Sequence, residues 1–74
     1  MQLTVKLFAF FRDGRFKEEG REYPEGTKVG DIVDDLGIVR EEVGVVMINS
    51  RQSSLDAPVA AEDVLAIFPV IGGG

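Results

Sequence analysis

A chain of 74 residues has room for one domain with one modest core, and 45% hydrophobic with 28% charged residues is an ordinary globular composition. Cysteine and histidine are both absent, which excludes disulfides, thiolate metal sites, cysteine nucleophiles and a histidine general base. The formal net charge of −5 argues against binding to nucleic acid, whose phosphates require clusters of lysine and arginine.

The sequence also argues against a membrane protein. No apolar stretch approaches the length of a membrane span, and residues 1–4 lack the basic region and long apolar segment of a signal peptide. We therefore expect a cytoplasmic location. An acidic chain of this kind fits a partner protein with a basic docking surface.

The first predicted elements form a β-hairpin. Residues 2–10 alternate, with Phe8 and Phe10 on the face opposite the core-facing side chains. Asp13-Gly14 predicts a turn, and a second strand is expected over residues 21–23, ending at Pro24. The side chains expected to face the core are Leu3, Val5, Leu7 and Ala9.

A helix follows the hairpin. Thr27 is a suitable N-cap, and Gly37 supplies a left-handed stop. Between them, one face repeats with the spacing of a buried helical stripe, formed by Val29, Ile32, Val33 and Leu36.

The second half of the chain contains two more predicted strands, over residues 45–48 and 64–68. Residues 51–62 look irregular, with Leu55 and Val59 as anchors to the core. A hairpin, a crossover helix and a return strand can share one sheet. The predicted fold class is therefore α+β, with a mixed sheet of four to five strands and one main helix on one face.

No catalytic group is evident. The acidic pairs at 34–35, 41–42 and 62–63 are adjacent in sequence, and we interpret them as solvated surface rather than acid–base pairs or metal ligands. No glycine-rich phosphate loop is present. The sequence predicts neither catalytic residues nor a metal site in this chain.

The C-terminal glycines, Gly72, Gly73 and Gly74, are the most distinctive feature. After a rigid strand they would form a thin arm, and residues 70–74 could extend about 16–18 Å into another protein's active site. There the terminal carboxylate could be activated by adenylation and then accept sulfur or be joined to an amine. The alternative is a frayed or artificially extended terminus, and the tail alone does not decide between them.

The strand faces add a second hypothesis. If Val64, Ala66 and Phe68 face the helix, Leu65 and Ile67 emerge on the outer face beside Phe8. That arrangement predicts an exposed apolar patch near the base of the tail, which is typical of a partner surface. The alternative is that the two phenylalanines fold under the long irregular stretch.

Three segments together resemble one known family. Residues 5–9 (Val-Lys-Leu-Phe-Ala), 24–27 (Pro-Glu-Gly-Thr) and 63–70 (Asp-Val-Leu-Ala-Ile-Phe-Pro-Val) look like the small subunit of molybdopterin synthase. That protein is a ubiquitin-like sulfur carrier of the MoaD/ThiS type, and the resemblance covers nearly the whole chain. It implies a β-grasp (ubiquitin-like) domain over residues 1–69 and a flexible tail over residues 70–74.

The resemblance also implies a function. An E1-like enzyme, using ATP and magnesium, would adenylate the last glycine, which would then become a thiocarboxylate. The tail would donate its sulfur, in the large subunit of molybdopterin synthase, to the pterin precursor of molybdenum or tungsten cofactor. The chain itself would bind no cofactor and would be a co-substrate rather than an enzyme.

The resemblance further suggests which residues act. Gly74 would carry the sulfur, or Gly73 if Gly74 is trimmed, because the family ends in two glycines that match Gly72 and Gly73. Phe8 and Ile67 match apolar interface positions, and Arg12 falls at the rim. The full set expected at the partner interface is Phe8, Phe10, Arg12, Leu65, Ile67, Pro69, Val70 and Ile71.

Three alternatives remain open. One is a sulfur carrier for thiamine or sulfur amino-acid synthesis. Another is a ubiquitin-like modifier joined through its tail to lysines of other proteins. The third is a plain interaction domain whose glycine tail has no role.

Overall fold

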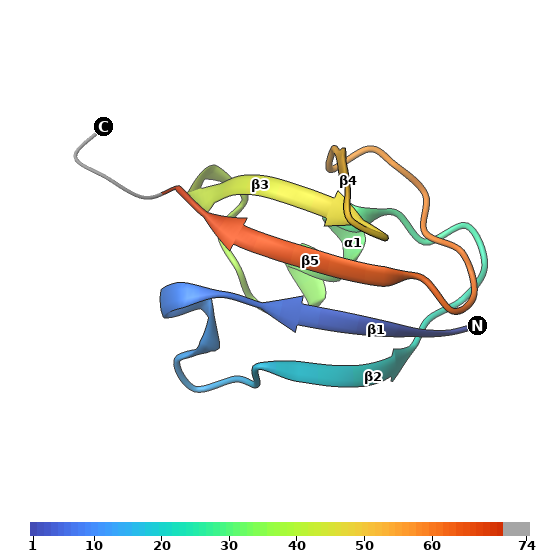
Figure 1. The fold of residues 1–74 in the computed structure, drawn as a ribbon, viewed down its shortest axis with the longest axis horizontal. Coiled ribbons are helices and arrows are strands. Elements are labelled where there is room, and N and C mark those ends of the chain that lie inside the picture. Colours follow the sequence, from blue (N-terminus) through green and yellow to red (C-terminus); the bar gives the residue numbers. More distant parts are fainter. Residues whose placement is uncertain (71–74) are drawn as a thin grey trace.

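The computed structural model describes residues 1–70, and a parallel pair of strands lies at its centre (Figure 1). β1 (Gln2–Leu7) and β5 (Val64–Pro69) pair in parallel, with Val5 opposite Leu65 and Leu7 opposite Ile67. Parallel strands end at the same edge of a sheet. The chain after β1 therefore lies next to the end of β5, where the C-terminal residues begin.

Three further strands complete one mixed sheet. β2 (Glu18–Glu22) pairs antiparallel with β1, β3 (Val43–Ile48) antiparallel with β5, and β4 (Arg51–Ser53) antiparallel with β3. The order across the sheet is β2-β1-β5-β3-β4. The predicted mixed sheet and its N-terminal hairpin are confirmed.

The main helix covers one face of this sheet. α1 (Val29–Asp35) lies behind the sheet in Figure 1, and two short 3-10 helices, η1 (Ala9–Arg12) and η2 (Arg40–Glu42), follow β1 and precede β3. Within residues 1–70, no helix lies across the opposite face, which we call the outer face. None of these helices is long and apolar enough to cross a membrane.

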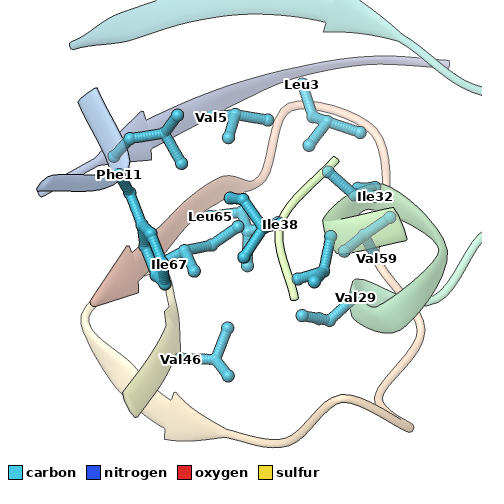
Figure 2. Packing of buried hydrophobic residues seen from close by; sticks show 12 residues of the cluster. Leu3, Val5, Phe11, Val29, Ile32, Ile38, Val46, Val59, Leu65 and Ile67 are labelled. Atoms are coloured by element: carbon cyan, nitrogen blue, oxygen red, sulfur yellow. The ribbon is translucent and has the colours of Figure 1, made fainter. Parts of the chain in front are cut away.

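The core lies between the sheet and α1 (Figure 2). Each fully buried aliphatic or aromatic side chain contributes about 1.5–3 kcal/mol relative to exposure. The buried set contains the predicted helix face except Leu36, which is half-buried, and three of the four predicted β1 residues. Its members are Leu3, Val5, Leu7, Phe11, Val29, Ile32, Val33, Ile38, Val46, Val59, Leu65 and Ile67.

The structure corrects the prediction for Ala9. Ala9 was expected to face the core, but the chain leaves the strand after Leu7, and η1 places Ala9 in solvent and Phe11 in the core. In this one-turn 3-10 helix the side chains repeat every three residues rather than every two. The alternation of side chains along β1 therefore does not continue into η1.

The helix boundaries also differ. α1 begins after Lys28, whose backbone N–H donates to Asp31 at 2.9 Å, whereas the hydroxyl of Thr27 donates to the Pro24 carbonyl at 2.7 Å. Thr27 is therefore not the N-cap. The predicted stop at Gly37 is confirmed by its φ of 73°.

β4 was not expected, because residues 51–62 looked irregular. Asn49 and Ser50 both have left-handed backbones, with φ of 51° and 68°, and they turn the chain back along β3. The predicted anchors agree with the structure, since Leu55 is half-buried against the core and Val59 is buried.

Candidate functional site

Leu65 and Ile67 do not lie on the outer face. Both side chains have no exposed surface and belong to the core (Figure 2). Their partners in β1 are the inward-facing Val5 and Leu7, and residues opposite each other in a sheet point to the same side. The prediction that these two residues emerge beside Phe8 is therefore wrong, and neither offers a surface to a partner.

The outer face nevertheless carries an apolar patch, because β5 is apolar on both sides. Phe68 lies opposite Val45, and Ala66 lies opposite Met47 on one side and Lys6 on the other. We call this set the outer patch: Phe8, Val45, Met47, Ala66 and Phe68. Val45 is 40% exposed and the other four are half-buried, so the patch is open to solvent.

Phe8 and Phe68 form the centre of the outer patch. Their rings are stacked, with centroids 4.1 Å apart and planes inclined by 11°. The guanidinium carbon of Arg12 lies 5.2 Å from the centroid of the Phe8 ring, and its Nε donates to the Leu7 carbonyl at 2.7 Å. This contact fits a cation–π interaction and holds one positive charge at the border of the outer patch.

The other predicted interface residues fall into three groups. Phe10 is 45% exposed in η1 and makes an edge contact with Phe11, with ring centroids 5.1 Å apart. Pro69 is buried at the end of β5, so its side chain does not offer the predicted surface to a partner, whereas Val70 is 52% exposed. The remaining predicted residues, Ile71, Gly72, Gly73 and Gly74, lie outside the described residues.

The chain leaves β5 at a defined point. The Val70 N–H donates to the Glu42 carbonyl at 2.8 Å, which is the last backbone contact of the described segment. This point lies next to Phe68, so the outer patch and the start of the tail occupy the same end of β5. We call residues 42–44, 69 and 70 the tail exit.

The acidic pairs do not form an active site in residues 1–70. Asp34 receives two hydrogen bonds from Arg40, at 3.0 and 2.9 Å, and these hold its pKa below the usual value. Asp63 accepts from the Asn49 amide at 2.9 Å and from the Ala60 N–H at 2.8 Å, which fixes the turn before β5. No group of acidic residues in this segment is arranged to hold a metal ion.

Four members of the outer patch were not predicted from the sequence: Val45, Met47, Ala66 and Phe68. The alternation in residues 64–68 was visible, but both sets of side chains are apolar, so periodicity alone could not assign them to faces. Pairing with β1 supplies the missing information, because Val5 and Leu7 face inward and fix Leu65 and Ile67 beside them.

Comparison with solved structures supports this fold at full length. A Pyrococcus furiosus protein assigned as molybdopterin converting factor subunit 1 is 28% identical, with a TM-score of 0.76 over 96% of this chain and 99% of that one. SAMP1 of Haloferax volcanii, a small archaeal modifier protein, is 25% identical, with a TM-score of 0.74 over 100% of both chains.

A third structure, of molybdopterin-converting factor subunits 1 and 2 from Helicobacter pylori in complex, includes a chain that is 16% identical with a TM-score of 0.65 over 100% of both chains. At that identity the likeness concerns the fold. A comparison with curated proteins gives no significant match. The profile of the ThiS family, however, matches residues 5–74. The chain therefore belongs to the ThiS family and has the β-grasp fold of the ubiquitin-like sulfur carriers and modifiers.

Proposed function

We propose that this chain is a sulfur carrier whose C-terminal glycine is adenylated and converted to a thiocarboxylate. The thiocarboxylate then donates its sulfur to the pterin precursor in molybdenum or tungsten cofactor biosynthesis. The observation that carries the proposal is the position of the outer patch beside the tail exit, at the base of the glycine tail. A partner that docks on the patch receives the tail at the same time.

The chemistry belongs to the partners. In the first step a carboxylate oxygen of the last glycine attacks the α-phosphorus of ATP, and pyrophosphate leaves. In the second, sulfide (HS−) attacks the acyl carbon, AMP leaves, and loss of the thiol proton gives the thiocarboxylate. This chain supplies a carboxylate on a narrow arm and an apolar surface that holds the arm in place. Because it contains neither histidine nor cysteine, an E1-like enzyme has to provide the groups that activate the carboxylate.

Two partner classes follow from the proposal. The first is the E1-like adenylating enzyme, which uses ATP and magnesium, and the second is the large subunit of molybdopterin synthase. The Helicobacter pylori complex of subunits 1 and 2 supports the second class by analogy of fold. The Pyrococcus furiosus relative, whose description is a candidate molybdopterin converting factor subunit 1, supports the molybdopterin pathway.

Intact-mass spectrometry tests the proposal. The chain is incubated with an E1-like enzyme, ATP, magnesium and a sulfur source, or is purified from its native host. The expected result is a mass gain equal to one oxygen replaced by sulfur, mapped to the last glycine. A chain that forms the acyl-adenylate but never the thiocarboxylate, under conditions in which a known carrier does, would contradict the proposal.

A protein modifier is the second candidate, and the similarity to SAMP1 over the full length of both chains favours it specifically. The same acyl-adenylate would then be transferred to lysine side chains of other proteins. Mass spectrometry of tryptic peptides from the native host distinguishes the two, because a modifier leaves the segment that follows its last trypsin site, residues 52–74 after Arg51, on lysines of its targets. Both species can be measured in one extract.

A further inference from the structure

The tail exit contains a bulge in β3. Val45 lies opposite Phe68 and Val43 lies opposite Pro69, so β3 uses one more residue than β5 between these two pairs. That extra residue is Gly44. A bulge bends its strand and commonly marks the point where pairing ends. Here it lies beside the last residue of β5.

Space, rather than backbone conformation, requires glycine at this position. A Cβ on Gly44 would lie 2.8 Å from the carbonyl oxygen of Pro69 and 3.0 Å from the Cα of Val70. Gly44 is not among the residues with positive φ, so alanine could adopt its backbone angles. The atoms it would strike belong to the backbone and cannot rotate away. The chain leaving β5 therefore passes this close to β3 only because residue 44 has no side chain.

The close approach permits one further hydrogen bond. Pro69 has no N–H, so it cannot donate to β3, and the Val70 N–H donates to the Glu42 carbonyl instead, at 2.8 Å. Because the Val70 side chain is 52% exposed, this backbone bond rather than burial holds the residue. The bulge and the bond together fix the direction in which the chain leaves the sheet.

We propose that Gly44 is a positioning residue for activation of the C-terminal carboxylate, an inference that rests on the proposed function. Four residues follow Val70, and they can extend about 13–14 Å at most. Within that reach the carboxylate has to meet the α-phosphorus of ATP at about 3–3.5 Å. An exit fixed at Val70 restricts the directions that the arm can take from a docked domain, which raises the fraction of complexes poised to react.

This role predicts a specific kinetic signature. The outer patch, which provides the docking surface, does not include Gly44, so losing the exit geometry leaves the affinity for the enzyme unchanged. The turnover number for adenylation falls, because it depends on the placement of the carboxylate. A displacement of about 1 Å can cost as much as about 100-fold in rate.

Gly44→Ala is the test variant, and Gly20→Ala is its matched control. Gly20 is also an exposed strand glycine without positive φ, but a Cβ there would meet only the side-chain amide of Gln2, at 3.0 Å. Adenylation is followed as pyrophosphate exchange into ATP with the E1-like enzyme. Binding of each full-length chain to that enzyme is measured without ATP. Hydrogen exchange of the β5 amides reports whether the sheet is intact.

The expected result is that Gly44→Ala keeps its affinity and its β5 protection but loses about tenfold or more in turnover number, whereas Gly20→Ala equals the wild type. Equal turnover numbers for Gly44→Ala and the wild type would overturn the inference. So would a loss of affinity in proportion to the loss of turnover, since that pattern marks a purely structural role.

A second pair of variants decides the matter if Gly44→Ala does not fold. Val70→Pro removes the N–H that donates to Glu42, and Pro69 already has the extended backbone that precedes a proline. Val70→Ala keeps the N–H and controls for the lost side chain. A lower turnover number for Val70→Pro than for Val70→Ala supports the inference, and equal values overturn it.

If the wild type itself is not adenylated, the proposed function fails instead, so the two failures are distinguishable.

Discussion

The aromatic rings of Phe8 and Phe68 lie face to face, with centroids 4.1 Å apart and planes inclined by 11°. Phe8 directly follows β1, and Phe68 is the last residue but one of β5. The stack therefore joins the ends of the two central strands on the outer face. Because both rings are half-buried, the pair is held in place by the fold and still presents apolar surface to a partner.

Replacing Phe8 by alanine is expected to weaken binding to the E1-like enzyme by about 2 kcal/mol, or about 30-fold in Kd. The physical reason is the loss of a large rigid contact at the centre of the outer patch. Isothermal calorimetry measures the affinity. Val39→Ala is the control, since Val39 is 54% exposed between α1 and η2 and lies outside the patch. Equal affinities for the two variants would contradict the docking hypothesis.

Much of the fold could be predicted, because several segments have only one apolar face. The helix stripe of Val29, Ile32 and Val33 is flanked by charged residues, so its buried side is unambiguous. β5 lacks this contrast, and the faces of Leu65 and Ile67 depend on their pairing with β1, which is a long-range property.

Two further features depend on local geometry that the residue pattern does not encode. Phe11 enters the core because η1 turns the chain after Phe8, and three phenylalanines within four residues offer no periodicity to indicate which of them is buried. β4 contains only Arg51–Ser53, which are polar or charged, and it forms because the turn at Asn49 returns the chain to β3. The sequence thus predicted an apolar patch at the end of β5, where the structure has one, but it assigned Leu65 and Ile67 to the wrong face.

Ile67→Ala tests the corrected orientation of β5. Because this side chain has no exposed surface, its truncation is expected to lower the free energy of unfolding by about 2–5 kcal/mol. Val64→Ala, on the outer side of the same strand, should cost less because Val64 is half-buried. Urea denaturation measures both. A variant at Ile67 that keeps wild-type stability would show that this residue faces solvent.

Arg15, although far from α1 in the sequence, is expected to stabilise the C-terminal end of α1. Its Nε donates to the Leu36 carbonyl at 2.9 Å, and its two terminal nitrogens donate to the carbonyls of Gly37 and Phe11, each at 3.2 Å. A cation at a helix C-terminus also interacts favourably with the helix dipole. Arg15→Ala should lower the free energy of unfolding by about 1 kcal/mol. Arg51→Ala, an exposed arginine of β4, controls for the lost charge, and equal stabilities would contradict the prediction.

Tyr23 provides a spectroscopic test of the contact between β2 and α1. Burial raises its pKa above the usual 10.0, and donation of its hydroxyl to Asp35 at 3.0 Å raises it further, whereas the hydrogen bond from Arg21 at 2.9 Å acts in the opposite direction. Because the folded state holds the proton more tightly than the unfolded state, the stabilisation is present below pH 10 and is lost as pH rises through the folded pKa.

An ultraviolet titration follows this group directly, since Tyr23 is the only tyrosine and the chain has no tryptophan. Asp35→Asn is expected to lower the pKa of Tyr23 relative to the wild type, because it removes a charged acceptor. Identical titration curves for the two proteins would show that the contact with Asp35 does not form in solution.

Deletion of the last residues separates the fold from the proposed chemistry. Residues 1–70 contain the whole described sheet and core, so a chain that ends at Gly72 should keep the stability of the full chain and its affinity for the outer-patch partner within a few-fold. Thiocarboxylate formation should be abolished, because the carboxylate then lies one residue short of Gly73 or two residues short of Gly74, about 3–7 Å in an extended arm. Deletion of Gly74 alone identifies the acceptor: sulfur transfer at the wild-type rate assigns it to Gly73, and loss of transfer assigns it to Gly74. If the chain that ends at Gly72 supported the pathway of its host as fully as the full chain while forming no thiocarboxylate, the carrier function would be contradicted, and a domain that acts through its outer patch alone would be favoured.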